Sequence, residues 1–144
     1  LYCGVGLFAG ALADRLGDEG AVLGIESGKR AVEDARHNLA GFDRVRIEQG
    51  KVEAVLPRTG ITEVDLIVLD PPRAGAGRKT VQHLSSLGAR RIAYVACDPA
   101  ALARDLGYFR DGGYRVRTLR VFDLFPMTHH VECVAILEPA GKGS

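Results

Sequence analysis

Short apolar runs alternate along the chain with longer stretches in which apolar residues recur every three or four positions. The first pattern is typical of strands and the second of amphipathic helices, so the alternation predicts an α/β protein. The predicted strands are residues 21–25, 44–48, 63–69, 91–96, 114–125 and 131–137. The predicted helices are residues 7–16, 29–39, 52–56, 79–87 and 100–110. A short loop joins the last two strands, which we therefore expect to form an antiparallel hairpin.

The chain opens on a glycine-rich turn, Leu1-Tyr2-Cys3-Gly4-Val5-Gly6, that leads directly into the first predicted helix. Almost no strand precedes the turn, so we expect a sheet whose first strand is truncated. Gly4 and Gly6 permit a tight turn and a close backbone approach to a ligand, and the helix N-terminus points at the same place. This arrangement favours a bound cofactor, although a plain structural turn is the alternative when such a motif stands alone.

Glu26 ends the next predicted strand, about 20 positions after the glycine turn. Nucleotide-binding α/β folds place an acidic residue there to accept hydrogen bonds from ribose hydroxyls. The alternative is a carboxylate that stabilises the start of the helix at 29–39, and the two roles do not exclude each other. The spacing favours the functional role.

Length and composition indicate one domain over residues 1–140, followed by a disordered tail at 141–144. No apolar run approaches the roughly 20 residues that a membrane helix needs, and no signal segment is visible. Three cysteines at scattered positions form neither a disulfide framework nor a zinc pattern, and the adjacent His129 and His130 lack a third convergent ligand. We expect a cytoplasmic protein that holds no metal and contacts no membrane.

The two halves of the chain differ in charge. Residues 1–72 carry 8 Lys and Arg against 12 Asp and Glu, whereas residues 73–144 carry 11 against 6, so the net charges are −4 and +5. Because nucleic-acid binding depends on neutralising phosphates, the basic half supplies candidate contacts. These are Arg73, Arg78, Lys79, Arg90, Arg91 and Arg104. The alternative is that such arginines simply solubilise helix faces and strand ends.

Cys97 follows the apolar run at 91–96 and stands immediately before a helix start, Asp98-Pro99. The carboxyl ends of parallel strands are where ligands collect in α/β folds, so the thiol is a candidate nucleophile. A helix N-terminus and nearby arginines favour the thiolate. The alternative is a small packing residue, which is how we interpret Cys3 and Cys133.

Glu132 lies near the beginning of the last, otherwise apolar strand. A carboxylate is costly there unless it is partnered or used, which favours a general base acting together with Cys97. An exposed strand end is the alternative.

Asp70-Pro71-Pro72-Arg73 follows the apolar strand at 63–69. Two prolines continue neither strand nor helix, so they should hold Asp70 and Arg73 in a rigid extended loop at the carboxyl edge of the sheet. The small, glycine-rich residues 74–78 that come next are expected to be mobile.

Four motifs in this order resemble the uracil-C5 RNA methyltransferases, the enzymes that make 5-methyluridine in tRNA and ribosomal RNA with S-adenosylmethionine. The motifs are Leu-Tyr-Cys-Gly-Val-Gly at 1–6, Asp-Pro-Pro-Arg-Ala-Gly at 70–75, Ala-Cys-Asp-Pro-Ala at 96–100 and Phe-Pro-Met-Thr-His-His-Val-Glu at 125–132. The resemblance implies a Rossmann-like, S-adenosylmethionine-dependent methyltransferase sheet with helices on both faces and a terminal antiparallel hairpin.

The resemblance also implies a role for each matching residue. Cys97 corresponds to the nucleophile and Glu132 to the base, while Arg73 and Asp98 are assigned to the RNA substrate. The predicted donor-binding residues are Tyr2, Gly4, Gly6, Leu7, Glu26 and Asp70. Leu7 departs from the pattern, because well-known members have an asparagine there that touches the donor, so that contact is lost or made by backbone.

The family's chain continues upstream with the first sheet strand, a further donor-binding glutamine and usually an RNA-binding domain. We therefore expect a C-terminal catalytic fragment whose exposed sheet edges could pair in a homodimer. Two alternatives stay open. The fragment could fold or self-associate without catalysing anything, or the Asp70-Pro71-Pro72 loop could belong to an amino-methyltransferase, although Arg73 and the Cys97/Glu132 pair argue against the latter.

Overall fold

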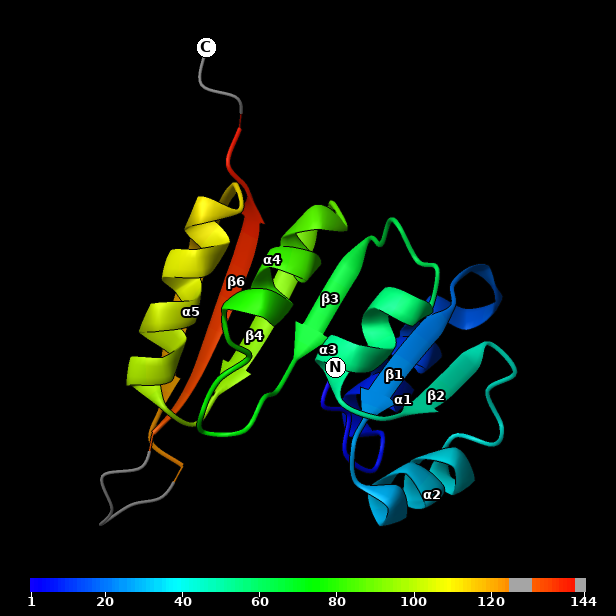
Figure 1. The fold of residues 1–144 in the computed structure, drawn as a ribbon. Coiled ribbons are helices and arrows are strands. Elements are labelled where there is room, and N and C mark those ends of the chain that lie inside the picture. Colours follow the sequence, from blue (N-terminus) through cyan, green and yellow to red (C-terminus); the bar gives the residue numbers. More distant parts are fainter. Residues whose placement is uncertain (125–130, 142–144) are drawn as a thin grey trace. The chain divides into compact units, whose positions relative to one another are not determined.

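The computed structural model describes residues 1–124 and 131–141, and its chain divides into two compact units (Figure 1). Unit 1 is Leu1–Gly60 and unit 2 begins at Ile61. Each unit has its own strands and its own buried side chains, so each is described by itself. In the described part of the chain, no helix is long and apolar enough to cross a membrane.

Unit 1 contains two parallel strands with helices before, between and after them. Its elements are α1 (Leu7–Leu16), the 3₁₀ turn η1 (Gly17–Glu19), β1 (Val22–Glu26), α2 (Lys29–Asn38), β2 (Val45–Gln49), α3 (Val52–Val55) and the 3₁₀ turn η2 (Leu56–Arg58). The strands are in register from Val22 opposite Val45 to Glu26 opposite Gln49. Both strands therefore end at the same edge, where Glu26 stands.

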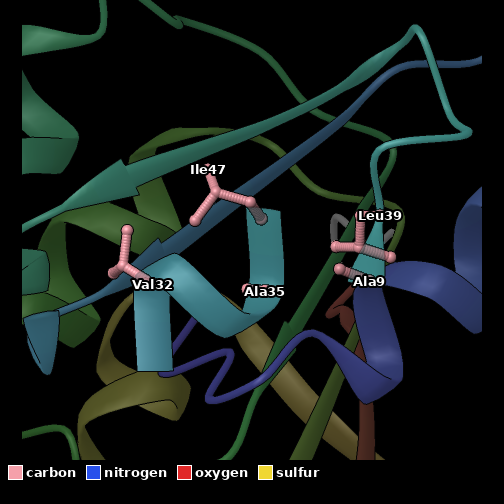
Figure 2. Close-up of a cluster of buried hydrophobic side chains, with 5 residues drawn as sticks. All are labelled: Ala9, Val32, Ala35, Leu39 and Ile47. Carbon is pink, nitrogen blue, oxygen red and sulfur yellow. The ribbon is translucent and has the colours of Figure 1, made fainter. Parts of the chain in front are cut away.

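A small cluster of aliphatic side chains forms the core of unit 1 (Figure 2). Its buried members are Ala9, Val32, Ala35, Leu39 and Ile47. Val32, Ala35 and Leu39 recur at the spacing of one helical face, which explains why α2 packs here although most of its residues are polar.

Unit 2 contains a four-stranded mixed sheet in the order β3-β4-β6-β5. Its elements are β3 (Leu66–Leu69), α4 (Arg78–Ser86), β4 (Arg91–Ala96), α5 (Pro99–Asp111), β5 (Tyr114–Phe122) and β6 (Glu132–Pro139). β3 and β4 are parallel, whereas β6 is antiparallel to both β4 and β5. The last strand in the chain therefore lies between two strands that precede it.

Helices α4 and α5 pack against each other, and α5 also contacts β4 and β5. The side chains of β4 alternate, with Ile92 and Tyr94 fully buried, as expected for a strand with one face against the helices. Phe109 on α5 makes edge-to-face contacts with Tyr94 and Tyr114, with ring centroids 6.4 Å and 6.1 Å apart. These aromatic contacts join the middle of β4, the helix that follows it and the start of β5.

The element types predicted from the sequence are confirmed, and the terminal hairpin is antiparallel as expected. The boundaries shift by a few residues. β3 begins at Leu66 rather than at 63, and β5 ends at Phe122 rather than at 125. Residues 125–130, which include His129 and His130, and residues 142–144 of the expected tail lie outside the described residues.

Candidate active site

Cys97 directly follows the last residue of β4 and is half-buried. Asp98, the next residue, is the N-cap of α5, and its Oδ1 accepts a hydrogen bond from the backbone amide of Ala101 at 2.7 Å. Pro99 occupies the first helical position. The predicted helix start is therefore confirmed, and it fixes the backbone on the C-terminal side of the thiol.

In the register of β4 and β6, the position of Glu132 lies opposite that of Cys97. Ala96 is paired with Cys133 in this antiparallel ladder. One step further along each strand come Cys97 and Glu132, the residues predicted as nucleophile and base. The backbone positions of the two residues are therefore neighbours at the end of the ladder.

A small depression in the surface of unit 2 adjoins Cys97. Its lining comes from the loop after β3, the end of β4 and the start of α5, and consists of Pro71, Pro72, Arg73, Gly75, Tyr94, Ala96, Cys97, Asp98 and Ala101. The structure thus brings together Arg73, Cys97 and Asp98, three of the predicted site residues.

Asp70 follows β3 at the same edge of the sheet, because β3 and β4 are parallel and Leu69 pairs with Tyr94. Desolvation by the surrounding protein raises the pKa of the Asp70 carboxyl above its ordinary value. Because burial keeps water from the ionised carboxylate, a hydrogen-bond donor beside it would stabilise its charge.

The loop at 74–78, expected to be mobile, is instead held by hydrogen bonds to α5. The backbone amides of Ala76 and Gly77 donate to the carboxylate of Asp105, which is fully buried. Asp105 was not among the predicted site residues. Its signal was available, since Asp105 lies between Leu102 and Phe109 on the apolar face of α5, where a carboxylate needs partners.

The other two cysteines fit the packing roles that were predicted. Burial raises the pKa of the Cys133 thiol, which is 3% exposed, and the nearby Glu132 raises it further. Burial also raises the pKa of Cys3, which packs against the core of unit 1. A thiol with a raised pKa is a poor source of thiolate, so neither is suited to nucleophilic attack.

In unit 1, the carboxylate of Glu26 links the glycine turn to the start of α2. Its Oε2 accepts from the amide of Gly4 at 3.0 Å, and its Oε1 accepts from the amide of Gly28 at 2.7 Å. Burial acts to raise the pKa of Glu26, but the hydrogen bonds from Gly28, Gly4 and Ser27 outweigh it and hold that pKa below its ordinary value. A charged carboxylate suits both roles proposed for Glu26, the binding of ribose hydroxyls and the stabilisation of the start of α2.

Gly4 and Gly6 have different surroundings. A Cβ on Gly4 would meet no atom within 4 Å, whereas a Cβ on Gly6 would lie 2.7 Å from Cδ1 of Leu39. Open space beside the backbone therefore exists at Gly4, and Gly6 is needed for packing in the core of unit 1. Donor binding by Gly6 stays a prediction.

Two further predicted donor residues flank the glycine turn. Tyr2 has a φ of +56°, a left-handed conformation that costs energy for a residue other than glycine and often marks a functional position. Leu7, the first residue of α1, is 76% exposed. An exposed leucine offers apolar contact but no hydrogen bond from its side chain, in keeping with the predicted loss of the asparagine contact.

The glycine turn yields a prediction about stability. We expect Gly6→Ala to lower the free energy of unfolding by about 1–3 kcal/mol, because the new methyl group overlaps Leu39 and the φ of +93° disfavours alanine. Gly4→Ala is the matched control, with a positive φ but open space, and should cost about 1 kcal/mol or less. Urea denaturation measures both, and equal losses would show that the contact with Leu39 is unimportant.

The hydrogen bonds of Glu26 yield a prediction about pH. Because its folded-state pKa lies below the ordinary value of 4.5, the stabilising charge is fully present above pH 4.5 and is lost as the pH falls through the folded-state pKa. We expect Glu26→Gln to be less stable than the wild type at pH 7, with the difference closing in acid. Denaturation from pH 7 to pH 3 measures this.

Glu33→Gln is the control, since the Glu33 side chain is 62% exposed on α2 of the same unit. This variant should track the wild type at every pH. A gap between Glu26→Gln and the wild type that stays constant down to pH 3 would contradict the role given to the charge.

Comparisons with known proteins indicate the family and the fold. Residues 59–140 match the family described as tRNA (Uracil-5-)-methyltransferase. An uncharacterized RNA methyltransferase of Streptomyces coelicolor is 94% identical over 143 residues, covering 99% of this chain and 31% of that protein. A similarly described protein of Gloeobacter violaceus is 43% identical over 139 residues, covering 95% of this chain and 29% of that protein. The chain thus spans about a third of the length of these relatives.

Solved structures show the same likeness. The tRNA (uracil-54, C5)-methyltransferase of Pyrococcus abyssi, in complex with S-adenosyl-L-homocysteine, has a TM-score of 0.80 and 35% identity over 94% of this chain and 32% of its own. Fibrillarin of Aeropyrum pernix, with natively bound S-adenosyl-L-methionine, has a TM-score of 0.74 at 16% identity over 92% of this chain and 63% of its own, which speaks for the fold alone. Since the family match covers more than half of the sequence, the chain belongs to the tRNA (uracil-5-)-methyltransferase family of RNA methyltransferases and has their α/β methyltransferase fold, with a mixed sheet and a C-terminal antiparallel hairpin.

Proposed function

We propose that these residues belong to the catalytic part of an enzyme that transfers a methyl group from S-adenosylmethionine to C5 of a uridine in tRNA or ribosomal RNA. The observation that carries the proposal is the ladder between β4 and β6. Its register brings the positions of Cys97 and Glu132 together at the edge of the sheet where the 70–73 loop also emerges. A nucleophile and a base side by side are what C5 methylation of uracil requires.

The residues of unit 1 fit the methyl donor. The backbone at Gly4 has open space beside it, α1 begins three residues later at Leu7, and Glu26 presents a charged carboxylate next to that turn. Amides at a helix start suit the donor's carboxylate, and Glu26 suits its ribose hydroxyls. Bound S-adenosylmethionine would supply the electrophilic methyl group that C5 takes up.

Cys97 makes C5 reactive. Uracil C5 is a poor nucleophile, but a bond from the Cys97 thiolate to C6 moves the ring electrons into an enolate whose negative charge is shared with C5. The N-terminus of α5 lies just beyond the thiol, where its amides favour negative charge. The thiolate is regenerated when the bond to C6 breaks.

Glu132 completes the cycle as a general base. After methylation C5 still bears its proton, and the carboxylate removes it while the electron pair reforms the C5–C6 double bond and expels the Cys97 sulfur. Glu132 is the first residue of β6, so the ladder with β4 fixes the backbone from which its carboxylate acts.

Arg73 and Asp98 are proposed to hold the RNA at the depression beside Cys97. A base must leave its stack to reach such a site, so a loop nucleotide is the expected target, and Arg73 supplies positive charge for a phosphate. An RNA substrate and a reduced nucleophilic thiol are both consistent with a cytoplasmic enzyme.

The homodimer through an exposed sheet edge also stays a proposal. In the four-stranded sheet, β5 is an edge strand, yet it carries a bulge between Val116 and Thr118 and several arginines. Both features disfavour edge-to-edge pairing, so β5 is a poor candidate for the strand through which a dimer would form.

The nucleophile can be tested by trapping. We expect the natural full-length protein that contains these residues to form a covalent complex with 5-fluorouridine-containing tRNA in the presence of S-adenosylmethionine, because fluorine cannot leave C5 as a proton does. Cys97→Ala should form none. A denaturing gel that separates free protein from the protein–RNA complex measures this.

Cys133→Ala is the matched control, because it removes a buried thiol from the strand paired with β4 and should leave the complex intact. A Cys97→Ala variant that still methylates uridine would overturn the mechanism. Absence of a complex with the wild type, across both tRNA and ribosomal RNA, would favour a protein that does not catalyse this reaction.

The base can be tested with natural uridine. We expect Glu132→Gln to reduce turnover about 100-fold or more and to accumulate a methylated covalent complex, because the C5 proton then has no acceptor. Glu138→Gln is the control at the other end of β6, where the carboxylate accepts from Arg115 and Arg117. A Glu132→Gln variant with wild-type turnover in a methylation assay would assign the base elsewhere.

A further inference from the structure

Asp105 is a buried carboxylate that three neighbouring parts of unit 2 share. Its side chain is 0% exposed. Oδ2 accepts from the hydroxyl of Tyr94 on β4 and from the amide of Ala76 in the loop, both at 2.7 Å, and from the amide of Gly77 at 3.2 Å. Oδ1 accepts from Nε and Nη2 of Arg104 at 3.1 Å and 2.9 Å. The carboxylate is therefore well supplied with donors.

The loop lies directly against this carboxylate. A Cβ on Gly75 would be 2.6 Å from Oδ2 of Asp105 and 2.7 Å from Nη2 of Arg104. The same Nη2 donates to the carbonyl of Ala74 at 2.7 Å. Only a glycine backbone comes this close, so the Asp105 contact fixes the path of the loop.

The anchored loop also lines the depression at Cys97. Gly75 belongs to that lining together with Pro72 and Arg73, and the amide of Gly75 donates to the carbonyl of Pro72 at 2.8 Å. Tyr94, which binds the same carboxylate, stands three residues before Cys97 on β4. One buried group therefore joins the segment that carries Arg73 to the strand that carries the nucleophile.

We propose that Asp105 is a positioning residue for the methylation proposed above, holding the 72–77 loop, and with it Arg73, in place beside Cys97. Asp105 itself touches neither base nor donor. Burying a carboxylate is costly even when its hydrogen bonds are satisfied, and an apolar residue would pack on this face of α5 at less cost. Preorganisation of the loop explains why a carboxylate stands here, because stability alone would favour the apolar residue.

The test compares Asp105→Asn with Asp111→Asn in the natural full-length protein. Asparagine has the shape of aspartate but only one acceptor oxygen, so its NH₂ group faces either the donors of Ala76, Gly77 and Tyr94 or those of Arg104. Either orientation weakens the hold on the loop, because Nη2 of Arg104 also donates to the carbonyl of Ala74. Asp111 is the matched control, because it lies on the same helix with its side chain 57% exposed. Tyr94→Phe, with Tyr108→Phe as its control, removes the hydroxyl that donates to Asp105 and accepts from the amide of Ala76, and it serves if Asp105→Asn does not fold.

Two measurements are made on each variant. The first is the rate constant of complex formation with saturating 5-fluorouridine-containing tRNA, since a rate constant does not depend on how much of the protein is folded, whereas the amplitude does. We expect a 10- to 100-fold decrease for Asp105→Asn, a smaller decrease for Tyr94→Phe and RNA affinity within about threefold of the wild type. The second is amide hydrogen exchange at Ala76 and Gly77, which should accelerate in Asp105→Asn.

A wild-type rate constant with a reduced amplitude would make Asp105 a merely structural residue and overturn the proposal. Unchanged exchange at Ala76 and Gly77 in Asp105→Asn would overturn it as well. If the wild type formed no complex with RNA, the proposed function would fall, and the loop anchor would be judged by exchange alone. Accelerated exchange would then support the anchor, and wild-type exchange would reject it.

Discussion

The antiparallel pairing of β4 with β6 is the constraint on which the candidate site depends. Cys97 and Glu132 are far apart in the sequence, and only the alignment of Ala96 with Cys133 makes them neighbours. A slip of one residue in this ladder would set Cys97 opposite a residue other than Glu132. The buried alternation of both strands opposes such a slip, since Cys133, Ala135 and Leu137 would leave the core.

Each unit also uses a carboxylate to fix a glycine-containing turn. Glu26 accepts from the amide of Gly4 in unit 1, and Asp105 accepts from the amides of Ala76 and Gly77 in unit 2. Glycine turns have large conformational entropy, so a charged acceptor that binds their amides removes alternatives that the backbone would otherwise sample. The two carboxylates differ in burial, because Glu26 stays partly open to solvent while Asp105 is enclosed.

Much of the fold could be predicted because local signals were consistent. The helical spacing of Val81 and Leu84, the Asp98-Pro99 helix start and the apolar run before Cys97 all gave the observed elements. Strand order could not be predicted in this way, because no local sequence pattern indicates that β6 lies between β4 and β5. Whether a segment is anchored depends on distant partners too. Small residues at 74–78 indicated mobility, but the group that binds them lies about one helix and one strand further along the chain.

The position of β6 has a consequence for the order in which the protein folds during synthesis. β6 follows β4 and β5 in the sequence, yet it lies between them in the four-stranded sheet, so this sheet stays incomplete until β6 has been synthesised. Synthesis proceeds from the N-terminus, and the strand that delivers Cys97 therefore emerges well before the one that begins with Glu132. During that interval Cys97 lacks the residue that the completed sheet sets opposite it. The proposed chemistry therefore requires the non-local pairing of β4 with β6.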